Sequence, residues 1–543
     1  MLNNKLKALN IHNRRHLYYL IAVIALVAIF FHYYKVDTLP RGYYLDETSF
    51  GLNSATLVKD GTDEYGTPWP LYFKAYGEYK NPIFIYATAG FFKIFGISEL
   101  SLRLTNVTFY VLAYLIFIAL LFKVFRSKPY LIIWGTIAFG LLPSFFAVSR
   151  VSFGVNTQLP WVVAIILFAY IALSTASKAT RLKASLVLAA LIGTSVYTYT
   201  TARLLSFLIF LTFAFCLIDF GQLKRKRGMF VSHENLKILL LMVLIIIITL
   251  IPYIIFAIDV PGGLTGRFKG ISYVDDPIPL TEKVGLFVFN YSNYWWSNYL
   301  ISDADHNLRH SIGYGGAFYL SVILLSVICL VVWVKNRVIL NNRFVKFIFI
   351  SWLLSPIAAA TINDMNVLRT FTTGIYWVIG SCFGLQYLYG ILVVRAQKPI
   401  VYFLFGFLIL ESCIYLLSYF VMFPERSIAG SESYDVKATY ESALSQEPKR
   451  IWFLAIPYAS YTNIKFRMHT VGEFEEHPVK IVYRSSDIKV MRGDCVIYQI
   501  RNEAEIKTNL PIRYQERNAF ELNFAQKVGG AWPRDHYTRL RCY

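Results

Sequence analysis

Long apolar stretches recur along this chain and alternate with shorter polar segments. Each stretch has about 20 residues, which is enough for a helix to cross a hydrocarbon layer roughly 30 Å thick. We count about eleven of them and predict a transmembrane helix for each. The stretches cover residues 17–33, 104–124, 130–148, 158–176, 184–200, 204–220, 237–258, 315–334, 344–362, 371–392 and 399–422. The pattern therefore predicts a polytopic α-helical membrane protein.

Three polar segments are long enough to fold outside the membrane. They are a first loop at 34–103, a large loop at 259–314 and a C-terminal tail at 423–543. In the tail, polar and apolar residues alternate, as in RIWFLAIPYASY and VKIVYRSSDIKVM, which indicates strands. We predict a transmembrane domain over 1–422 with interfacial helices in its loops, and a small α+β domain over 423–543.

The chain is strongly basic, with a formal net charge of +20. Its cations gather before the first span and in alternate loops, such as Lys123–Lys128 and Lys224–Arg227. The positive-inside rule places those loops in the cytoplasm, so the charge indicates membrane orientation and argues against nucleic-acid binding. The expected result is a multi-pass protein of the cell membrane with a cytoplasmic N-terminus and an extracytoplasmic C-terminal domain. No A-x-A-like site follows the first span, which favours an uncleaved signal anchor.

The composition agrees with a membrane protein and adds little chemistry. Hydrophobic residues make up 56% of the chain and the mean hydropathy is +0.47. Cysteines within the spans are expected to behave as small hydrophobic residues. Cys495 and Cys542 lie in the tail and either form a disulfide or stay reduced. Neither a G-x-G-x-x-G motif nor a P-loop nor a metal-ligand spacing is found, so no cofactor is firmly implied.

An acidic pair, Asp46-Glu47, lies just beyond the first span. A carboxylate at the edge of the membrane can act on a substrate that is itself anchored in lipid. As a general base it would accept the proton of an attacking hydroxyl, which contributes roughly 10²–10⁴-fold to a rate. Adjacent helical residues point about 100° apart, so we assign this role to Asp46 alone. Glu47 would orient the acceptor or hold a cation. Alternatively, the pair only begins an interfacial helix, where acids suit the helix dipole.

Further motifs accompany the acidic pair: Lys80-Asn81-Pro82, FFKIFG and Ser101–Leu104, then PSFFAVSRVSFGVN, TSVYTYTTARLL, DHNLRHSIGYGGAFY and PIAAATINDMNVLRTF. Together they resemble the GT-C superfamily of glycosyltransferases that use polyprenyl-phosphate sugars, the group of the protein O-mannosyltransferases and the lipid A aminoarabinose transferase. Asn81 stands where close relatives often have proline, and Gly154 where an acidic residue is frequent. The resemblance covers about residues 10–420. It implies a GT-C-like fold, a polyprenyl-phosphate-sugar donor and a glycan, lipid or protein acceptor.

Cations at the outer ends of the spans are candidates for binding the phosphate of such a donor. Arginine offers a planar fork that matches phosphate oxygens, whereas lysine acts as a point charge. The alternative is that these side chains reach lipid headgroups. We favour Lys80 and Arg369, because each lies in a stretch that resembles the family. The full set is Lys80, Arg150, Arg203, Arg309 and Arg369.

The loop at 295–315 and two neighbouring turns supply candidate substrate-binding residues. His306 and His310 are four residues apart and could bind a metal if the loop were helical, with Asp303 or Asp305 completing the set. The glycines that follow argue for an irregular loop, so a divalent metal is not expected. The residues expected to contact substrate are Tyr197, Tyr199, His306, His310 and Asp364.

Three functions are consistent with these patterns. The first is a membrane glycosyltransferase that transfers a sugar with inversion from a polyprenyl phosphate to an extracytoplasmic acceptor. The second is a transporter or flippase of lipid-linked sugars. Transporters usually carry ionisable groups near the middle of the bilayer, whereas here they gather at the outer ends of the spans, which favours the enzyme. The third is a sensor whose tail binds glycan without turnover.

Overall fold

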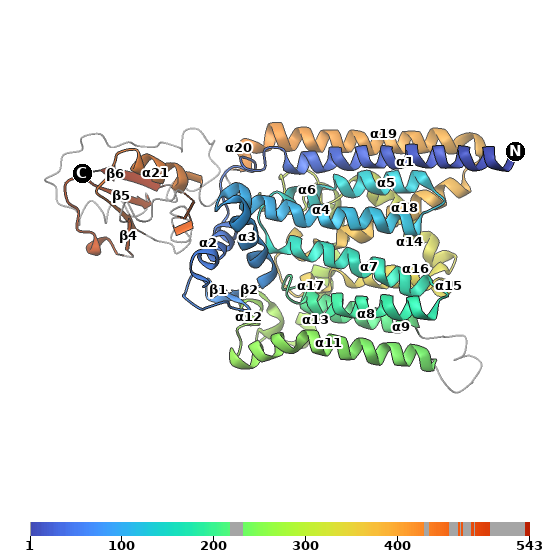
Figure 1. Ribbon diagram of the computed structural model, residues 1–543, viewed down its shortest axis with the longest axis horizontal. Coiled ribbons are helices and arrows are strands. Elements are labelled where there is room, and N and C mark those ends of the chain that lie inside the picture. The colour runs from blue at the N-terminus through green and yellow to red at the C-terminus, as the bar shows by residue number, and fades with distance from the viewer. Residues whose placement is uncertain are drawn as a thin grey trace.

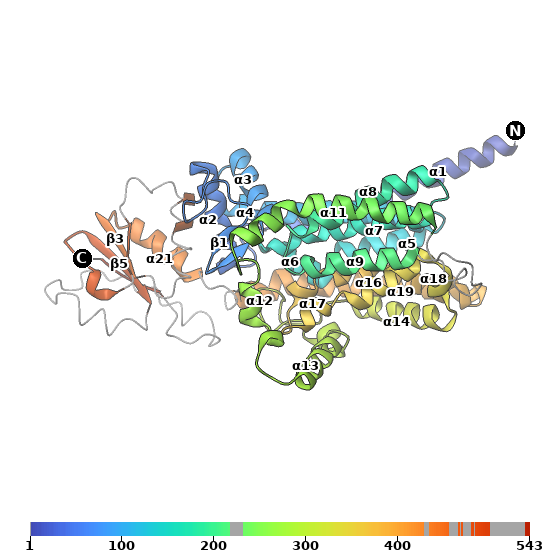
Figure 2. The same cartoon turned by 90° about the horizontal axis from the view of Figure 1, so that it is seen from below.

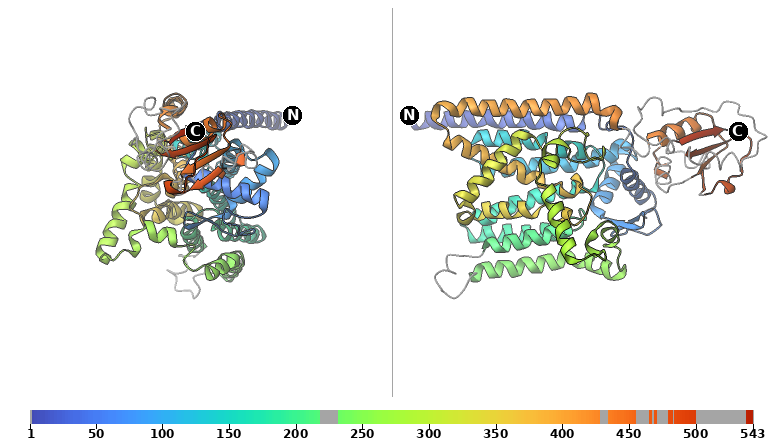
Figure 3. Two further views of the ribbon diagram at one scale, coloured as in Figure 1. Left: turned by 90° about the vertical axis from the view of Figure 1, so that its left-hand side faces the viewer. Right: turned by 180° about the vertical axis from the view of Figure 1, so that it is seen from behind.

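The computed structural model describes residues 2–217, 232–427, 434–454, 465–466, 469–470, 479–482, 484–499 and 538–542. Its long helices run side by side as a bundle, and a small sheet lies beyond one end (Figure 1). The N-terminus lies at the opposite end of the bundle, which is also clear from behind (Figure 3). The basic run Lys224–Arg227 lies outside the described residues.

Each predicted apolar stretch falls on a helix or on two consecutive helices. The helices are α1 (Leu2–Tyr33), α4 (Glu99–Val124), α5 (Pro129–Gly140) with α6 (Pro143–Ser149), α7 (Gln158–Ser174), α8 (Lys178–Ser195), α9 (Ala202–Leu217), α11 (His233–Asp259), α14 (Leu320–Lys335), α16 (Arg343–Leu354) with α17 (Ile357–Ala360), α18 (Thr373–Ile391) and α19 (Val394–Leu417). Short helices α15 (Val338–Asn341) and α20 (Phe423–Ser427) follow α14 and α19.

Fewer helices than predicted meet the length and composition of a membrane span. Within the part of the chain that the structure describes, six do so, or seven if the bent pair α5–α6 forms one span. The prediction of about eleven spans is thus confirmed only in part. Helices α9 and α14 have 16 residues each, and α8 carries Lys178, Arg181 and Lys183. Helix α18 is largely buried by its neighbours, so its sequence need not be uniformly apolar.

Consecutive long helices run in opposite directions, and this sorts their connections between the two ends of the bundle. The basic loop between α4 and α5 and the one between α14 and α16 lie at the end that holds the N-terminus (Figure 1). The acidic pair and the polar loops lie at the other end. Among the described residues, the cations of these two loops therefore lie at the same end of the bundle as the N-terminus.

The first outer loop folds against the end of the bundle that faces the C-terminal sheet. It forms helix α2 (Leu45–Asp60), the hairpin β1 (Phe73–Ala75) and β2 (Glu78–Lys80), and helix α3 (Pro82–Phe95). The second large loop adds α12 (Gly266–Ile271) and α13 (Leu280–Asn293), and α13 projects from the side of the bundle (Figure 2). Both loops therefore form helices, as we predicted for them.

The C-terminal residues form a small α/β unit. Its helix is α21 (Tyr434–Leu444), and the order of its strands is β4-β3-β5-β6. Strand β3 is parallel to β4 and to β5, whereas β6 is antiparallel to β5. The strands are β3 (Arg450–Leu454), β4 (Val479–Val482), β5 (Asp494–Gln499) and β6 (Thr538–Cys542). Cys495 and Cys542 form a disulfide between β5 and β6, which is one of the two states left open by the sequence.

Candidate active site

The β1–β2 hairpin places Lys80 next to the helix that carries the acidic pair. Its turn residues Tyr76 and Gly77 have φ angles of 53° and 79°, as in the tight two-residue turns that favour glycine in the second position. The register pairs Lys80 with Phe73, and the side chain of Lys80 is buried. Asp46 lies in the first turn of α2. Lys80 Nζ lies 3.0 Å from Asp46 Oδ1.

The two partners of this ion pair differ in access to solvent. The Lys80 side chain is 7% exposed, whereas that of Asp46 is 34% exposed. The Lys80 ammonium lies 4.3 Å from the centre of the Phe50 ring and 5.3 Å from that of Tyr76, which holds it in place by cation–π contacts. No hydrogen bond among the described residues reaches Asp46 Oδ2. This oxygen can therefore accept a hydrogen bond from a substrate hydroxyl.

The surrounding charges keep Asp46 ionised. Burial raises the pKa of its carboxyl. Lys80, with smaller contributions from Arg267 and Arg309, lowers that pKa by more than burial raises it, so the pKa lies below the usual 3.8. Arg267 also pairs with Glu78, at 3.1 Å between Nη1 and Oε1. Burial raises the pKa of Glu78, although Arg267 and Lys80 oppose this shift. The Asp46 carboxylate is thus surrounded by one further acid, Glu78, and by the cations Lys80, Arg267 and Arg309.

Two of the predicted site residues, Arg309 and Tyr199, approach Asp46 from other parts of the chain, and a third, Arg369, approaches Tyr199. The Arg309 guanidinium lies 3.7 Å from the centre of the Tyr44 ring, and Tyr44 is the N-cap of α2. Tyr199 is half-buried and lies within reach of the charges of Asp46 and Arg369. Arg369 donates to the backbone carbonyl of Asp364 at 2.8 Å and pairs with its carboxylate at 3.7 Å. The fold therefore gathers residues from four separate loops.

Glu47 is buried and points away from solvent. Its carboxylate accepts hydrogen bonds from Arg103 Nε at 3.0 Å and Nη2 at 3.3 Å, and from the backbone amides of Ser152 and Tyr44. The side chains of Glu47 and Arg103 are 1% and 0% exposed. Arg103 also donates to the carbonyls of Val36, Pro40 and Gly42. Of the two roles predicted for Glu47, the geometry supports the one in which it holds a cation, because a buried carboxylate with these partners cannot reach an acceptor.

Arg150, like Arg103, uses its guanidinium to bind backbone carbonyls within the protein. Its side chain is buried and donates to the Tyr419 hydroxyl and to the carbonyls of Phe31, His32, Tyr34 and Leu39. These five bonds use all the N–H groups of a guanidinium. Arg150 thus ties the end of α1 to α6, and none of its donors remains for the phosphate that we predicted it would bind.

Arg203 and Tyr197 lie together beside an apolar groove. Arg203 donates to Asn81 Oδ1 at 3.1 Å and to the carbonyl of Leu264, and its buried Nε has no hydrogen-bond partner among the residues that the structure describes. The Tyr197 hydroxyl accepts from the amide of Tyr253 and donates to the carbonyl of Thr249, the two groups that a regular helix would join directly. Tyr197 therefore stabilises α11 near its internal Pro252.

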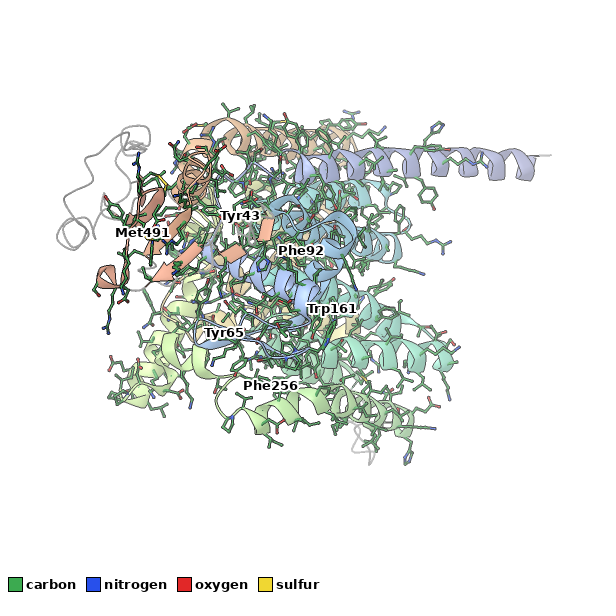
Figure 4. The ribbon with its side chains drawn as sticks, turned by 60° about the vertical axis from the view of Figure 1, so that its left-hand side comes forward. Tyr43, Tyr65, Phe92, Trp161, Phe256 and Met491 are labelled. Carbon is green, nitrogen blue, oxygen red and sulfur yellow. A yellow bond between two sulfur atoms is a disulfide. The ribbon has the colours of Figure 1, made fainter. Side chains whose placement is uncertain are left out.

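The groove itself opens between α3, α7, α8 and α11 and has a volume of about 610 Å³. Its lining includes Pro82, two residues after Lys80, and Trp161 of α7, which is labelled in Figure 4. Its lining is almost entirely apolar, so it suits a hydrocarbon chain. The lining residues are Leu71, Pro82, Ile83, Tyr86, Trp161, Thr194, Tyr197, Ile248, Thr249 and Pro252.

The two histidines of the second loop have different surroundings. His310 is buried, and its Nδ1 lies 2.8 Å from Asp305 Oδ2, which also accepts from the amide of Val367. His306 is 82% exposed and pairs with Asp303 at the surface. Since the two histidines use different carboxylates, they do not converge on one point. No group of three potential metal ligands is found in the described ranges.

Several residues around Asp46 were not predicted from the sequence. Glu78 and Arg267 lie in the site, and Arg103 holds the neighbouring Glu47. Asp305, which the sequence indicates only as a metal ligand, instead holds His310 and the amide of Val367. Arg103 lies in the Ser101–Leu104 motif, and Asp305 lies beside two histidines, so both carried a local signal. Glu78 and Arg267 had none, because their pairing depends on contact between two distant loops.

No protein-family model matches the chain, and no curated protein is a significant match. Solved structures do match. ArnT from Cupriavidus metallidurans in the apo state gives a TM-score of 0.55 over 97% of this chain and 98% of that chain, at 11% identity. The same protein bound to undecaprenyl phosphate gives a TM-score of 0.53 over 96% and 97% of the two chains, at 12% identity. The chain is a multi-pass helical membrane protein with the fold of ArnT, a lipid A aminoarabinose transferase, so the resemblance predicted from the motifs is confirmed at the level of the fold.

Proposed function

We propose that this protein is an integral-membrane glycosyltransferase that moves one sugar from a polyprenyl-phosphate donor to an acceptor outside the cell. The observation that carries the proposal is the half-exposed Asp46 paired at 3.0 Å with the buried Lys80, beside an apolar groove. The groove accommodates the lipid tail and the cations bind the phosphate. The similar ArnT binds undecaprenyl phosphate, which agrees with this choice of donor.

Asp46 acts as the general base. Its Oδ2 accepts the proton of the acceptor hydroxyl while the acceptor oxygen forms a bond to the anomeric carbon of the sugar. The bond between that carbon and the phosphate oxygen breaks, and the polyprenyl phosphate leaves with the electron pair. A single displacement of this kind inverts the anomeric centre. The acceptor can be a glycan, a lipid or a protein.

Lys80 links donor binding to the strength of this base. In the free protein Lys80 stabilises the ionised form of Asp46, which makes Asp46 a weak base. A donor phosphate close to Lys80 competes for its ammonium group. The pKa of Asp46 then rises towards the pKa of the acceptor hydroxyl, which favours proton transfer once the donor is bound. Arg267, Arg309 and Arg369 hold the remaining phosphate charge.

The locations of ionisable groups favour this enzyme over a transporter of lipid-linked sugars. The charged cluster lies at one end of the bundle, beside the interfacial helices, rather than midway along the spans. Glu411 in α19 is an acid within a span, and its carboxylate accepts from the amides of Leu320 and Ser321 at the start of α14. It therefore serves as a helix cap. The same proposal places the catalytic domain at 1–422 and the C-terminal domain, at 423–543, outside the cell.

Lipid mass spectrometry of cells that lack the protein tests the proposal. We expect a polyprenyl-phosphate sugar to accumulate and to disappear when the wild-type protein is restored. Asp46→Asn should restore less than about 1% of the transfer at equal amounts of folded protein, since it removes the base. Asp60→Asn, at the exposed end of the same helix, is the matched control and should restore it fully. No accumulation would refute the donor class, and an active Asp46→Asn variant would remove Asp46 from the mechanism.

A further inference from the structure

A side chain from the C-terminal part of the chain is buried against the helix that carries Asp46. Phe466 is 0% exposed and belongs to the same apolar cluster as Phe50 of α2 and Phe92 of α3. Its ring stacks on that of Phe92, with 6.4 Å between centroids and 18° between planes. Figure 4 labels Phe92 at the end of the bundle where the C-terminal part of the chain lies. The two parts of the chain therefore share one core at this point.

Gly51 provides the space that Phe466 occupies. It lies inside α2, where alanine is the better helix former. A Cβ atom at position 51 would lie 2.4 Å from Cε2 of Phe466, so even alanine would displace the ring. The Phe466 ring can therefore be buried here only because residue 51 has no side chain.

This contact adjoins a residue that touches the catalytic pair, because Gly51 directly follows Phe50 in α2. The ring of Phe50 carries the Lys80 ammonium at 4.3 Å, and Lys80 pairs with Asp46 at 3.0 Å. Phe50 is in turn fixed by Phe84, with the two rings 5.0 Å apart and nearly perpendicular. A shift of Phe466 would allow Phe50 to move, and the ammonium that rests on its ring would follow.

We propose that Phe466 is a positioning residue, through which the C-terminal domain holds the Lys80–Asp46 pair in its reactive geometry. The inference rests on the proposed function, because it assigns Phe466 a role in the same reaction. It makes the C-terminal domain part of the active site's support. Loss of the contact should affect both donor binding, through Lys80, and the chemical step, through Asp46.

A double-mutant cycle tests this role with the full-length protein in lipid nanodiscs. Phe466→Ala and Gly51→Ala should each raise the KM for the polyprenyl-phosphate-sugar donor and lower kcat, with kcat/KM falling about 10- to 100-fold, since a displacement near 1 Å can have an effect of this size. The double variant should be no worse than Phe466→Ala alone, because removing the ring relieves the clash at position 51. Gly90→Ala in α3, where an added Cβ meets nothing within 4 Å, is the matched control and should behave as wild type.

The outcomes separate this inference from the proposed function. If Asp46→Asn is inactive while both single variants keep kcat/KM within about twofold of wild type, the positioning role is refuted and the general base stands. If the two effects multiply in the double variant, they do not share one contact and the inference fails. If Phe466→Ala does not fold, the kcat/KM of Gly51→Ala alone tests the positioning role, because this variant keeps the Phe466 ring and adds a helix-favouring residue. An active Asp46→Asn variant would instead remove Asp46 from the mechanism, and a knockout that accumulates no polyprenyl-phosphate sugar would refute the proposed donor class.

Discussion

Replacing Glu47 with glutamine should destabilise the fold while leaving the chemical step intact. In the native protein the Glu47 carboxylate accepts four hydrogen bonds, two from Arg103 and one each from the amides of Ser152 and Tyr44. Glutamine has one carbonyl oxygen, and its amide would present N–H groups to at least one of these donors. The Arg103 guanidinium would remain buried without a counter-charge.

The burial of this pair sets the magnitude of the effect. Removing one partner of a buried ion pair costs about 3–5 kcal/mol, because the other charge stays desolvated. Since Arg103 keeps its bonds to the carbonyls of Val36, Pro40 and Gly42, we expect a value of about 3 kcal/mol, at the lower end. Thermal unfolding of the detergent-solubilised protein, followed by tryptophan fluorescence, measures the loss. Folded Glu47→Gln protein should retain a kcat within a few-fold of wild type.

A second arginine–glutamate pair provides the control. Arg41 Nη1 lies 2.7 Å from Glu425 Oε1, but the two side chains are 38% and 66% exposed. Such a pair contributes at most about 1 kcal/mol, so Glu425→Gln should unfold almost as wild type does. If Glu47→Gln unfolds at the same temperature as Glu425→Gln, the argument from burial is refuted. If it is stable but inactive, Glu47 belongs to the chemistry and not to the scaffold.

Three further predictions concern the site and its orientation. Lys80→Gln should raise the pKa of Asp46 in the free protein, since the effect of burial is then no longer opposed by the lysine charge. The acid limb of the kcat/KM profile, which reports the free protein, should therefore move to higher pH, and an unmoved limb would contradict the pairing. Arg369→Ala should weaken donor binding by about 1.5–3 kcal/mol with little change in kcat, which a donor titration measures; unaltered affinity would exclude contact with the phosphate. Cysteines introduced at Lys226 and at Glu473 should label from opposite sides of the membrane with an impermeant reagent, and labelling from one side would overturn the orientation.

Local patterns were sufficient for the scaffold of this protein. A helix that crosses lipid must be apolar over its whole length, so the spans are written as continuous stretches and each one formed a helix. The basic loops and the acidic pair after the first span could be recognised for the same reason, since each is a feature of neighbouring residues. The number of spans was less well predicted, because a helix such as α18 that is buried among others no longer has to match the lipid.

The roles of individual charges depended on contacts between distant residues. Asp46 and Glu47 are neighbours in the sequence, but only Glu47 meets Arg103, so one carboxylate is buried and the other remains accessible. Arg150 and Arg369 are both arginines that the sequence predicts at the outer end of a span. In the structure, however, the guanidinium of Arg150 donates all its hydrogen bonds to five acceptors from remote segments. Phe466 looked like an ordinary residue of the tail until its ring was found against Gly51. The periodicity of the sequence indicates whether a residue faces lipid or water. Which residue it contacts depends on how distant segments pack together, and no local pattern predicts that packing.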